Sequence, residues 1–522
     1  MSGEGASWDA PADLNIAEYF LDRRIAEGRG ERVALRGSFG EFTYREVQEL
    51  ANRFAQALVR LGVRPEERVL IALPDGPEYV GALFGVLKAG AVVVMVNPAL
   101  EPDSLAHLLR SSRARCAVVA DDLVEAFETA MGYGDGDGDG DGPELLVCGP
   151  EAGGHTSFAA IADELDAGFD NVPTHRDDPA IWLFSGGTTG RPKAVVQTHR
   201  SFANTTELYA KAALGYREDD VTISVPKLYF GYATGSNLLF PFAVGASAVL
   251  FPEPATAETL FEHVRRYRAT ILINVPKMVG RMVDEAAAAS PDLSSLRFAT
   301  SAGEALPVPL YERWKETFGV ELLDGLGTAE MWHVFVSNLP GAVKPGTLGR
   351  VVPGFEIEVR DDSGAEVAPD EVGKMWVRGD SRALGYWQDL DKTARAFRGE
   401  WFVGGDLVRR DAQGFVTYCG RGDDVLKVSG KWLAPQEVES CLMKHPAVAE
   451  CAVVGVEGEN GLTLPWAFVR ARERHDGLEE DLKAFALEQL QAYKHPRRVV
   501  VLDEFPRTHL GKIDRGKLKT LA

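Results

Sequence analysis

One nine-residue stretch, SGGTTGRPK, combines small residues, hydroxyls and cations in a spacing that suits an anion. It runs from Ser185 to Lys193 and follows the apolar, strand-like run Ala180–Phe184. Its glycines free backbone N–H groups to wrap a phosphate, the hydroxyls of Ser185, Thr188 and Thr189 add donors, and Lys193 adds positive charge. It is not a Walker loop, because GxxxxGK[ST] would need glycine at position 191, where this chain has arginine. The stretch therefore predicts a phosphate-binding loop after a buried strand.

The runs around this loop alternate between strand-like and helix-like patterns. Between Phe42 and Val249, apolar β-rich runs such as RVLIALP, AVVVMVN and AIWLFS are separated by helix-like stretches such as Tyr44–Leu61 and Pro77–Ala89. This alternation predicts βαβ units and parallel sheets. Two later runs, ATILINVP and LRFATSAGE, each end a buried strand in a polar turn. Because ligands of open α/β sheets bind at strand ends, we expect ligand contacts at these turns.

Length and composition limit the classes of protein that fit. The 522 residues exceed the usual size of one core, about 250–300 residues, so more than one domain is expected. The net charge of −21 would repel a phosphate backbone, which argues against nucleic acid as a partner. The amino-terminal run MSGEGASWDAPADLN lacks a basic and apolar signal segment, and no later run offers about 18 uncharged apolar residues. We therefore expect a cytoplasmic protein with no membrane partner.

Two patterns that suggest metal sites have simpler explanations. The five cysteines are odd in number and lack CxxC spacing, which argues against both a disulfide framework and a zinc site. Aspartate recurs at every second position between Met131 and Pro143, as in a calcium loop. An EF-hand loop needs glutamate at its twelfth position, and counting from Asp135 that position is Leu146. The repeat therefore predicts a flexible acidic surface loop.

Glycines and charges in GRGDDVLKVSGKWLAPQEVE mark a domain boundary near Asp423. The runs that follow, AECAVVGV, LPWAFVRA, DLKAFALEQL and RRVVVLD, form a compact α+β pattern. We expect one domain over residues 1–422 and a second over residues 423–522. Acidic and basic residues balance from Asp424 onward, so the negative charge belongs to the first domain. A neutral last domain with basic residues near its end suits a lid over a polyanionic small molecule, although an ordinary solvated basic face explains them equally well.

Motifs recur in order along almost the whole chain. Besides the phosphate loop, they are FTYREV at 42–47, LKAGAVVVMVNP at 87–98, TSAGEALP at 300–307, DGLGTAEM at 324–331, GYW at 385–387, FVGGDL at 402–407, GRGDDVLKVSGKWLAPQEVE at 420–439 and PRTHLGKIDR at 506–515. This set resembles the adenylate-forming superfamily of acyl-CoA synthetases, peptide-synthetase adenylation domains and firefly-type luciferases. The resemblance implies an α/β fold: a large N-terminal domain of parallel and mixed sheets packed with helices, a β-barrel-like subdomain, and a small mobile α+β lid. It also implies ATP and coenzyme A as substrates and Mg²⁺ as the metal ion.

Carried over position by position, the resemblance implies roles for the residues that handle ATP. Thr328 would touch the α-phosphate and Glu330 would hold Mg²⁺, which suits a site where a carboxylate attacks a polyanionic triphosphate. Asp406 would accept both ribose hydroxyls, and Arg421 would brace the ribose or the phosphate. Ala194 departs from the glycine usual in the family and leads into the next strand, so we expect little effect. The adenine walls would be Ser301, Ala302, Gly303, Glu304, Asp324 and Gly325.

The lid would supply the catalytic lysine and the hinge. Lys512 lies in a glycine-flanked loop, where its ammonium would bridge the attacking carboxylate and the α-phosphate. Asp423 matches the residue about which family members rotate the lid. One lid face would then serve adenylation, and the face that bears Gly430, Lys431 and Trp432 would serve thioester formation with CoA.

Two local runs, KLYFGYATG at 227–235 and MWHVFVSN at 331–338, resemble benzoate–CoA ligases more than fatty-acid or amino-acid enzymes. The resemblance implies a short aromatic pocket with Phe230 at the mouth of the pantetheine tunnel. Tyr229 and Trp332 could equally be core aromatics. The residues enclosing the substrate ring would be Gly231, Tyr232, Gly327, His333 and Val334.

Two departures from benzoate–CoA ligases bear on the substrate. Where those enzymes usually carry Ala-Tyr and His-Ile, this chain has Gly231-Tyr232 and His333-Val334. Each change removes a methyl-sized volume, and an unfilled void costs about 1 kcal/mol or more. A ring substituent could fill it, and the polar His333 suggests an amino- or hydroxybenzoate such as anthranilate or salicylate. The expected reaction is ATP-dependent formation of an aryl-adenylate, followed by transfer to CoA with release of AMP.

Other functions remain as alternatives. A stand-alone aryl-adenylating enzyme would load a carrier-protein thiol, but such enzymes usually place an Asn-Phe/Tyr-Pro type segment at 227–230. A luciferase-type oxygenase would need an extended pocket. A non-catalytic nucleotide-binding protein would be expected to have lost Lys512 or Glu330, which this chain keeps. The expected partners are small molecules, and a homodimer is one oligomeric state that similar proteins often adopt.

Overall fold

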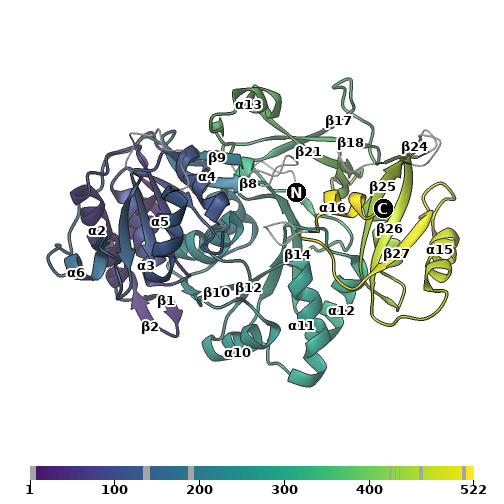
Figure 1. Cartoon of the computed structure of the whole chain (residues 1–522), viewed down its shortest axis with the longest axis horizontal. Coiled ribbons are helices and arrows are strands. Elements are labelled where there is room, and N and C mark those ends of the chain that lie inside the picture. The colour runs from purple at the N-terminus through teal and green to yellow at the C-terminus, as the bar shows by residue number, and fades with distance from the viewer. Residues whose placement is uncertain are drawn as a thin grey trace.

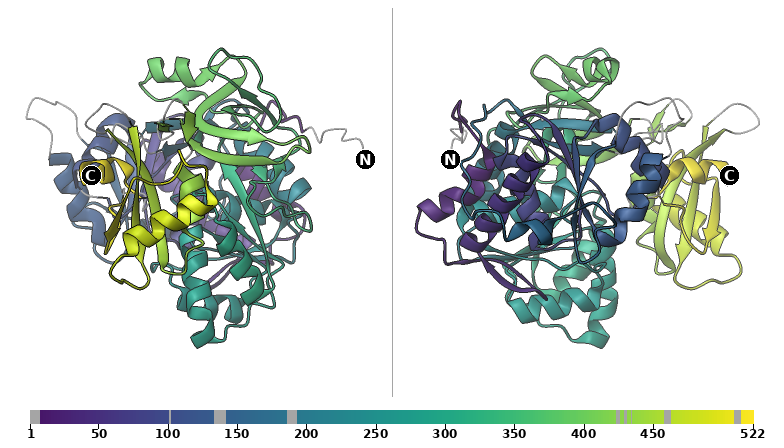
Figure 2. Two further views of the ribbon diagram at one scale, coloured as in Figure 1. Left: turned by 90° about the vertical axis from the view of Figure 1, so that its right-hand side faces the viewer. Right: turned by 60° about the vertical axis from the view of Figure 1, so that its left-hand side comes forward.

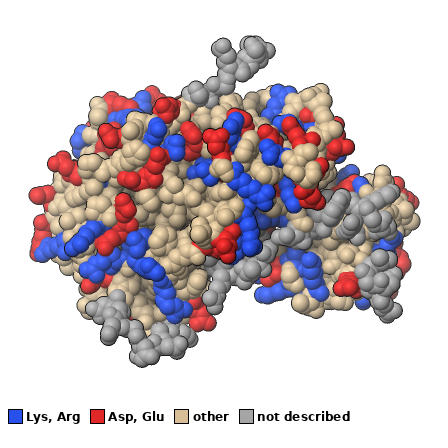
Figure 3. All heavy atoms as spheres, turned by 90° about the horizontal axis from the view of Figure 1, so that it is seen from above, with Lys and Arg blue, Asp and Glu red and all other residues tan. Residues whose placement is uncertain are grey.

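The structure is a computed structural model of the whole chain that describes residues 8–100, 102–132, 142–185, 193–422, 426–428, 431–433, 435–457, 463–507 and 513–522. Figure 1 shows a large body, purple to green, with a small yellow-green part beside it, which lies in front of the body in the left view of Figure 2 and at its edge in the right view. Acidic and basic side chains are interspersed over the face in Figure 3. Within the described ranges, no helix has the length and apolar character needed to cross a bilayer.

The first sheet has eight strands in the order β19-β9-β8-β4-β3-β5-β6-β7. Strands β3 to β8 run parallel. At one edge β9 pairs antiparallel with β8, and β19 pairs antiparallel with β9. The strands are β3 (Arg68–Ala72), β4 (Val92–Met95), β5 (Cys116–Ala120), β6 (Glu144–Cys148), β7 (Thr156–Ser157), β8 (Pro179–Ser185), β9 (Lys193–Thr198) and β19 (Gly385–Tyr386).

Helices cover both faces of this sheet, which is why its inner strands are continuous apolar runs. Val69 and Ile71 of β3 face one core, whereas Leu70 and Ala72 face the other. The first face packs against α2 and α3, and the second against α4 and α5. The parallel α/β arrangement predicted from the alternating runs is therefore confirmed. These helices are α2 (Tyr44–Arg60), α3 (Pro77–Lys88), α4 (Pro102–Ser112) and α5 (Val124–Gly132), with the short α1 (Arg23–Ala26) and α6 (Phe158–Ala162) nearby in the chain.

The second sheet has nine strands in the order β16-β15-β14-β13-β12-β10-β11-β1-β2. Its inner strands are parallel. At one edge β15 pairs antiparallel with β14 and β16 pairs antiparallel with β15, and at the other edge β2 pairs antiparallel with β1. The strands are β1 (Val33–Gly37), β2 (Gly40–Thr43), β10 (Val221–Ser224), β11 (Ser247–Val249), β12 (Ile271–Asn274), β13 (Phe298–Ser301), β14 (Glu321–Gly327), β15 (Val334–Ser337) and β16 (Arg350–Val351). The connecting helices are α7 (His199–Thr205), α8 (Gly231–Thr234), α9 (Phe240–Val244), α10 (Ala257–Tyr267), α11 (Pro276–Ala289) and α12 (Val308–Phe318).

An antiparallel sheet forms the β-rich subdomain at the top of Figure 1. Its order is β17-β18-β21-β20, and β22 pairs with β21. The elements are β17 (Glu356–Arg360), β18 (Val372–Arg378), α13 (Leu390–Ala396), β20 (Phe397–Arg398), β21 (Trp401–Arg410) and β22 (Val416–Arg421).

The remaining elements form a small α+β domain with apolar clusters of its own. Strand β26 lies between antiparallel β25 and parallel β27. Arg472 of this domain reaches Asp284 of α11 at 3.7 Å, so the domain rests against the large body. The elements are β23 (Leu426–Val428), β24 (Lys431–Leu433), α14 (Pro435–Leu442), β25 (Val448–Glu457), β26 (Thr463–Ala471), α15 (Leu478–Gln489), β27 (Arg498–Leu502) and α16 (Arg515–Thr520).

Candidate active site

Three neighbouring strands of the nine-stranded sheet end at one polar edge. The register pairs Asn274 of β12 with Ser301 of β13, and Ser301 with Asp324 of β14. Gly303 lies in the turn after β13 at φ +93°, a left-handed conformation that favours glycine. The structure therefore brings together, at one sheet edge, the residues predicted as adenine walls, which are Ser301, Ala302, Gly303, Glu304, Asp324 and Gly325.

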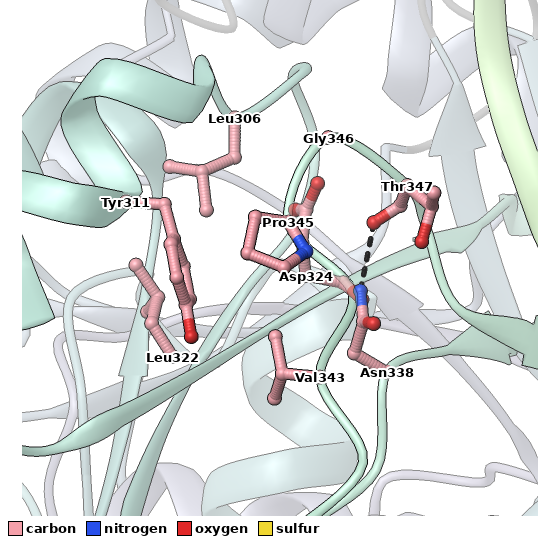
Figure 4. A pocket seen from close by; sticks show the side chains of 9 residues that line it. All are labelled: Leu306, Tyr311, Leu322, Asp324, Asn338, Val343, Pro345, Gly346 and Thr347. Atoms are coloured by element: carbon pink, nitrogen blue, oxygen red, sulfur yellow. Dashed lines mark hydrogen bonds between the residues drawn. The ribbon is translucent and has the colours of Figure 1, made fainter.

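Asp324 is the buried acid of this edge. Only 8% of the residue is exposed, and burial raises the pKa of its carboxyl to about 8, although the backbone N–H groups of Leu306 and Gly325 and the nearby Ser301 oppose the shift. Its Oδ1 atom is buried with no hydrogen-bond partner among the described residues. Figure 4 shows Asp324 in a small pocket beside Asn338, whose side-chain amide donates to the carbonyl of Thr347 at 2.7 Å. A carboxyl oxygen without a partner is therefore available at the predicted adenine site.

Two glycines allow the backbone after Asp324 to pass close to β15. A Cβ at Gly327 would lie 2.5 Å from the carbonyl oxygen of His333 and 2.8 Å from the backbone nitrogen of Val334. A Cβ at Gly325 would lie 2.9 Å from the carbonyl oxygen of Val336 and 3.1 Å from Cγ1 of Val334. Only glycine fits both positions without displacing backbone, so DGLG joins the predicted adenine wall to the predicted ring pocket.

Glu330 faces the end of the phosphate loop. The Thr328 hydroxyl caps the short turn Ala329–Met331 by accepting from the Met331 N–H at 3.3 Å. Glu330 is buried, and its Oε1 accepts a hydrogen bond from the Tyr386 hydroxyl at 2.8 Å. Nζ of Lys193 lies 5.1 Å from the centre of the Tyr386 ring. Tyr386 therefore links the predicted metal-binding carboxylate to the loop lysine.

Sequence reasoning did not select Tyr386 as a site residue, although it quoted the GYW motif that contains it. The proximity of Tyr386 to the site becomes clear only in the folded chain, where β19 pairs Tyr386 with Val195 of β9. Burial and the neighbouring Glu330 carboxylate raise the pKa of Tyr386 above its usual range, so the phenol keeps its proton and remains a donor.

Asp406 and Arg421 face each other across β21 and β22. Asp406 is 4% exposed, and its Oδ1 accepts from the Tyr418 hydroxyl at 3.2 Å and lies 3.4 Å from Nη1 of Arg421. The two residues predicted to hold the ribose are thus neighbours, and a carboxylate with a second oxygen can accept from a diol.

A neutral histidine stands at the centre of the predicted ring pocket. His333 is 3% exposed, and burial lowers the pKa of its imidazole to about 4. Nε2 lies 3.1 Å from the carbonyl oxygen of Tyr232 and 3.2 Å from the Ser236 hydroxyl. The Tyr232 hydroxyl in turn pairs with the Thr300 hydroxyl at 2.6 Å, one residue before the adenine edge. Phe240 packs edge-on against the imidazole at 4.7 Å.

These contacts fix the tautomer of His333. A carbonyl oxygen can only accept, so Nε2 must carry the proton toward Tyr232. The neutral ring then leaves Nδ1 as an acceptor, and this atom is buried with no hydrogen-bond partner among the described residues. The imidazole can therefore accept a hydrogen bond from a donor group and cannot supply one through Nδ1.

Two sequence-based interpretations change at this pocket. A Cβ at Gly231 would lie 3.2 and 3.3 Å from the two methyl carbons of Leu183, so the expectation that Gly231 leaves an open volume is wrong, because Leu183 fills it. Trp332, left open between core and site, is 2% exposed and packs on Phe202 at 4.4 Å. It holds φ at +61°, so its backbone turns sharply just before His333. Phe230 is the residue that precedes α8.

Several predicted residues lie outside the described part of the chain. They are Thr188 and Thr189 of the phosphate loop, the hinge residue Asp423, Gly430, the catalytic candidate Lys512, and most of the Asp-Gly repeat. For Ser185 of β8 and for Lys431 and Trp432 of β24, the described part includes the backbone but not the side chain.

Two protein families match successive parts of the chain. The AMP-binding enzyme family matches residues 22–387, and the AMP-binding enzyme C-terminal domain matches residues 437–512. Benzoate–CoA ligase of Thauera aromatica is 39% identical over 520 residues, covering 98% of this chain and 96% of that protein. The 4-hydroxybenzoate–CoA/benzoate–CoA ligase of Rhodopseudomonas palustris is 37% identical, covering 98% and 94%. The p-hydroxybenzoic acid–AMP ligase of Mycobacterium tuberculosis is 34% identical, covering 97% of this chain and 68% of that protein.

Solved structures agree with these relatives. The chain superposes on an anthranilate–CoA ligase in complex with anthranoyl-AMP with a TM-score of 0.93, 36% identity and 98% of both chains covered. A benzoate–CoA ligase from Burkholderia xenovorans LB400 gives a TM-score of 0.88 with 39% identity, covering 97% of this chain and all of that one.

Proposed function

The chain belongs to the AMP-binding enzyme family, and we propose that it activates an aromatic carboxylic acid with ATP and transfers the aryl group to CoA. In the first step a carboxylate oxygen attacks the α-phosphorus, and pyrophosphate leaves. In the second step the CoA sulfur, having lost its proton, attacks the acyl carbon, and AMP leaves. The products are aryl-CoA, AMP and pyrophosphate, which makes the enzyme an AMP-forming acid–thiol ligase.

One observation supports this proposal above the others. A single stretch, residues 324–334, carries Asp324 at the predicted nucleotide edge, Glu330 bonded to the Tyr386 ring that Lys193 also approaches, and His333 in an aromatic enclosure. An enzyme that joins a nucleotide phosphate to an aromatic acid needs these three environments in contact. A nucleotide-binding protein without acid chemistry would need only the first two.

For the nucleotide, we assign Oδ1 of Asp324 to accept from an adenine amino group and Asp406 to accept from the ribose. A buried acceptor without a partner is costly, and a ligand that satisfies it gains binding energy and specificity. Lys193 and the loop hydroxyls would neutralise the triphosphate, and Thr328 would contact the α-phosphate.

Mg²⁺ fits the residues present. The described residues contain no group of three or more His, Cys, Asp or Glu that could hold a metal alone. A Mg²⁺ that arrives on ATP needs only one or two carboxylates besides phosphate oxygens, and the buried Glu330 can provide one. When bound, the ion would neutralise charge on the departing pyrophosphate.

The lid roles complete the proposal. Lys512 would stabilise charge in the adenylation step, and rotation about Asp423 would bring the face with Gly430, Lys431 and Trp432 to the CoA tunnel beside Phe230. This assignment uses the division into residues 1–422 and 423–522. A cytoplasmic location and a homodimer belong to the same proposal.

For the acid, we propose a benzoate with a hydrogen-bond donor on the ring, of which 2-aminobenzoate and 2-hydroxybenzoate are examples. The basis is now the acceptor Nδ1 of His333 rather than a void at Gly231. The anthranoyl-AMP complex of the structural relative is compatible with this acid class. Tyr232, Gly327 and Val334 would form the rest of the ring enclosure.

Loading of a carrier-protein thiol is the alternative, because the AMP ligase relative is 34% identical to this chain over 510 residues. Two observations favour CoA. The segment at 227–230 lacks the Asn-Phe/Tyr-Pro type pattern, and the chain covers 96% of the first CoA ligase against 68% of the AMP ligase.

Incubating the protein with ATP, Mg²⁺ and a panel of benzoates, with and without CoA, tests the proposal. We expect acid-dependent pyrophosphate release without CoA, and aryl-CoA and AMP once CoA is added. Pyrophosphate release with no aryl-CoA would select the carrier-protein alternative. No acid-dependent pyrophosphate release with any benzoate would refute the function.

A further inference from the structure

A buried acid from the eight-stranded sheet holds the segment that begins the ring pocket. Asp75 lies between β3 and α3, is 6% exposed, and accepts a hydrogen bond from the backbone N–H of Leu228 at 2.9 Å through Oδ1. Leu228 follows β10 of the other sheet and is fully buried. This contact therefore joins the two sheets immediately before Phe230, Gly231 and the rest of α8.

The peptide of Leu228 is held from its other side as well. The Thr234 hydroxyl donates to the Leu228 carbonyl and lies 3.2 Å from the Phe230 carbonyl. The Phe230 N–H donates to the Lys227 carbonyl at 2.9 Å, which closes the turn. Asp75 thus binds the peptide before Leu228 and Thr234 binds the peptide after it, so the backbone is anchored on both sides of this residue. The position of α8, and hence of Tyr232, depends on both anchors.

The surroundings of Asp75 form a closed polar cluster that no step of the reaction uses. Nζ of Lys227 donates to the Phe251 carbonyl at 2.6 Å and lies 3.5 Å from the centre of the Phe251 ring. Burial raises the pKa of Asp75 to about 7 and lowers the pKa of Lys227 to about 8, while each charge favours the other. The Tyr79 hydroxyl beside them is buried without a partner among the described residues.

Such a cluster is costly in a position that needs only core packing, because a buried carboxyl must be desolvated. An apolar side chain at position 75 would leave the Leu228 N–H unsatisfied, and the acid avoids this. The same contact fixes the helix that presents Gly231 and Tyr232 to the acid. The free energy spent on desolvating the Asp75 carboxyl is thus offset by a contact that places the wall of the ring pocket.

We propose that Asp75 is a positioning residue for the aromatic acid, acting through the Leu228 peptide on α8. The proposal rests on the ring pocket assigned under the proposed function. Asp75 touches neither substrate nor nucleotide in this assignment, so its loss should affect the acid and spare ATP.

The test compares Asp75→Ala with Asp75→Asn, which keeps an acceptor oxygen for the Leu228 N–H. We expect Asp75→Ala to raise KM for the acid by on the order of 10-fold or more, with KM for ATP within about 2-fold. Asp75→Asn should stay within about 3-fold for both. Should Asp75→Ala fail to fold, Thr234→Val removes the second anchor and should raise KM for the acid in the same selective way.

Asp220→Asn is the matched control, because Asp220 is a buried acid that accepts from the Arg217 N–H at 2.8 Å at the opposite end of β10. It should lower Tm without a selective change in KM for the acid. Hydrogen exchange over residues 226–234 provides a readout that needs no turnover, and this segment should exchange faster in Asp75→Ala than in wild type.

Three results would overturn the proposal: an unchanged KM for the acid in Asp75→Ala, an equal rise in both KM values, or unchanged exchange over residues 226–234. Wild-type protein that releases no pyrophosphate with any benzoate would instead refute the proposed function, while the exchange experiment would still decide whether Asp75 holds the segment.

Discussion

Substitution of Gly327 by alanine tests whether the two walls of the active site depend on one close backbone approach. The added Cβ would meet the carbonyl oxygen of His333 at 2.5 Å, its carbonyl carbon at 2.6 Å and the nitrogen of Val334 at 2.8 Å. All three are backbone atoms, so no side-chain rotation relieves the contact. The peptide between His333 and Val334 must move by roughly 0.5–1 Å, and with it the imidazole.

Forcing a methyl group into a packed site costs about 1–3 kcal/mol, and a displacement of this size at a binding wall can cost on the order of 100-fold. We therefore expect Gly327→Ala to lower Tm and to lower kcat/KM for the aromatic acid by on the order of 100-fold. Steady-state kinetics of acid-dependent pyrophosphate release measures the second effect.

Gly168→Ala is the control, because a Cβ there meets nothing within 4 Å. At such a site alanine should leave kinetics unchanged and stabilise the protein slightly, since it restricts the unfolded chain. If Gly327→Ala keeps wild-type kinetics, β15 can move away from the added methyl group without displacing His333. That result would refute the claim that the close approach at Gly327 fixes the ring pocket.

Three further predictions concern the lid and the pocket. Lys512→Ala should lose on the order of 10²–10³-fold in adenylate formation and spare thioester formation from supplied acyl-adenylate, and equal losses in both half-reactions would make Lys512 structural. Asp423→Pro should keep adenylation and abolish CoA acylation, because proline fixes φ, and normal overall turnover would place the pivot elsewhere. Burial holds the pKa of His333 at about 4 against 6.5 when exposed, so between these values the unfolded chain binds more protons at this residue, and its contribution to stability falls as pH is lowered. The Tm of the wild type should therefore fall relative to that of His333→Phe as pH is lowered from 6.5 to 4, and a Tm difference that does not change with pH would contradict the burial argument.

Much of the fold followed from patterns that the sequence displays directly. Apolar runs of four to seven residues separated by helical stretches predict parallel strands, and β3, β4, β5 and β8 occur where those runs lie. The strand-end turns at TSAGE and DGLG lie on adjacent strands, as ligand sites of α/β sheets do. These features depend on local periodicity, which one sequence is enough to reveal.

Other features depend on contacts between distant segments and could not be predicted. Tyr386 reaches Glu330 because its strand, β19, joins the edge of the eight-stranded sheet. The other strands of that sheet end at Thr198, 187 residues before β19 begins. The space beside Gly231 is filled by Leu183 of β8, which lies 48 positions earlier in the chain. The type of one residue does not reveal which neighbour occupies the space beside it, and for this reason the proposed ring substituent depends on His333 and not on Gly231.

The arrangement of residues 324–334 has a consequence for how specificity can change. Val334 packs over Gly325 of the nucleotide wall, and the backbone at His333 abuts Gly327. Tyr232, whose ring lies 5.5 Å from that of His333, is tied through the Thr300 hydroxyl to the strand that ends at Ser301. Neither wall of the ring pocket can therefore move independently of the nucleotide edge. Acid selectivity should change most readily through groups that belong to neither β13 nor β14, and Leu183, which lies beside Gly231 and belongs to the other sheet, is such a group.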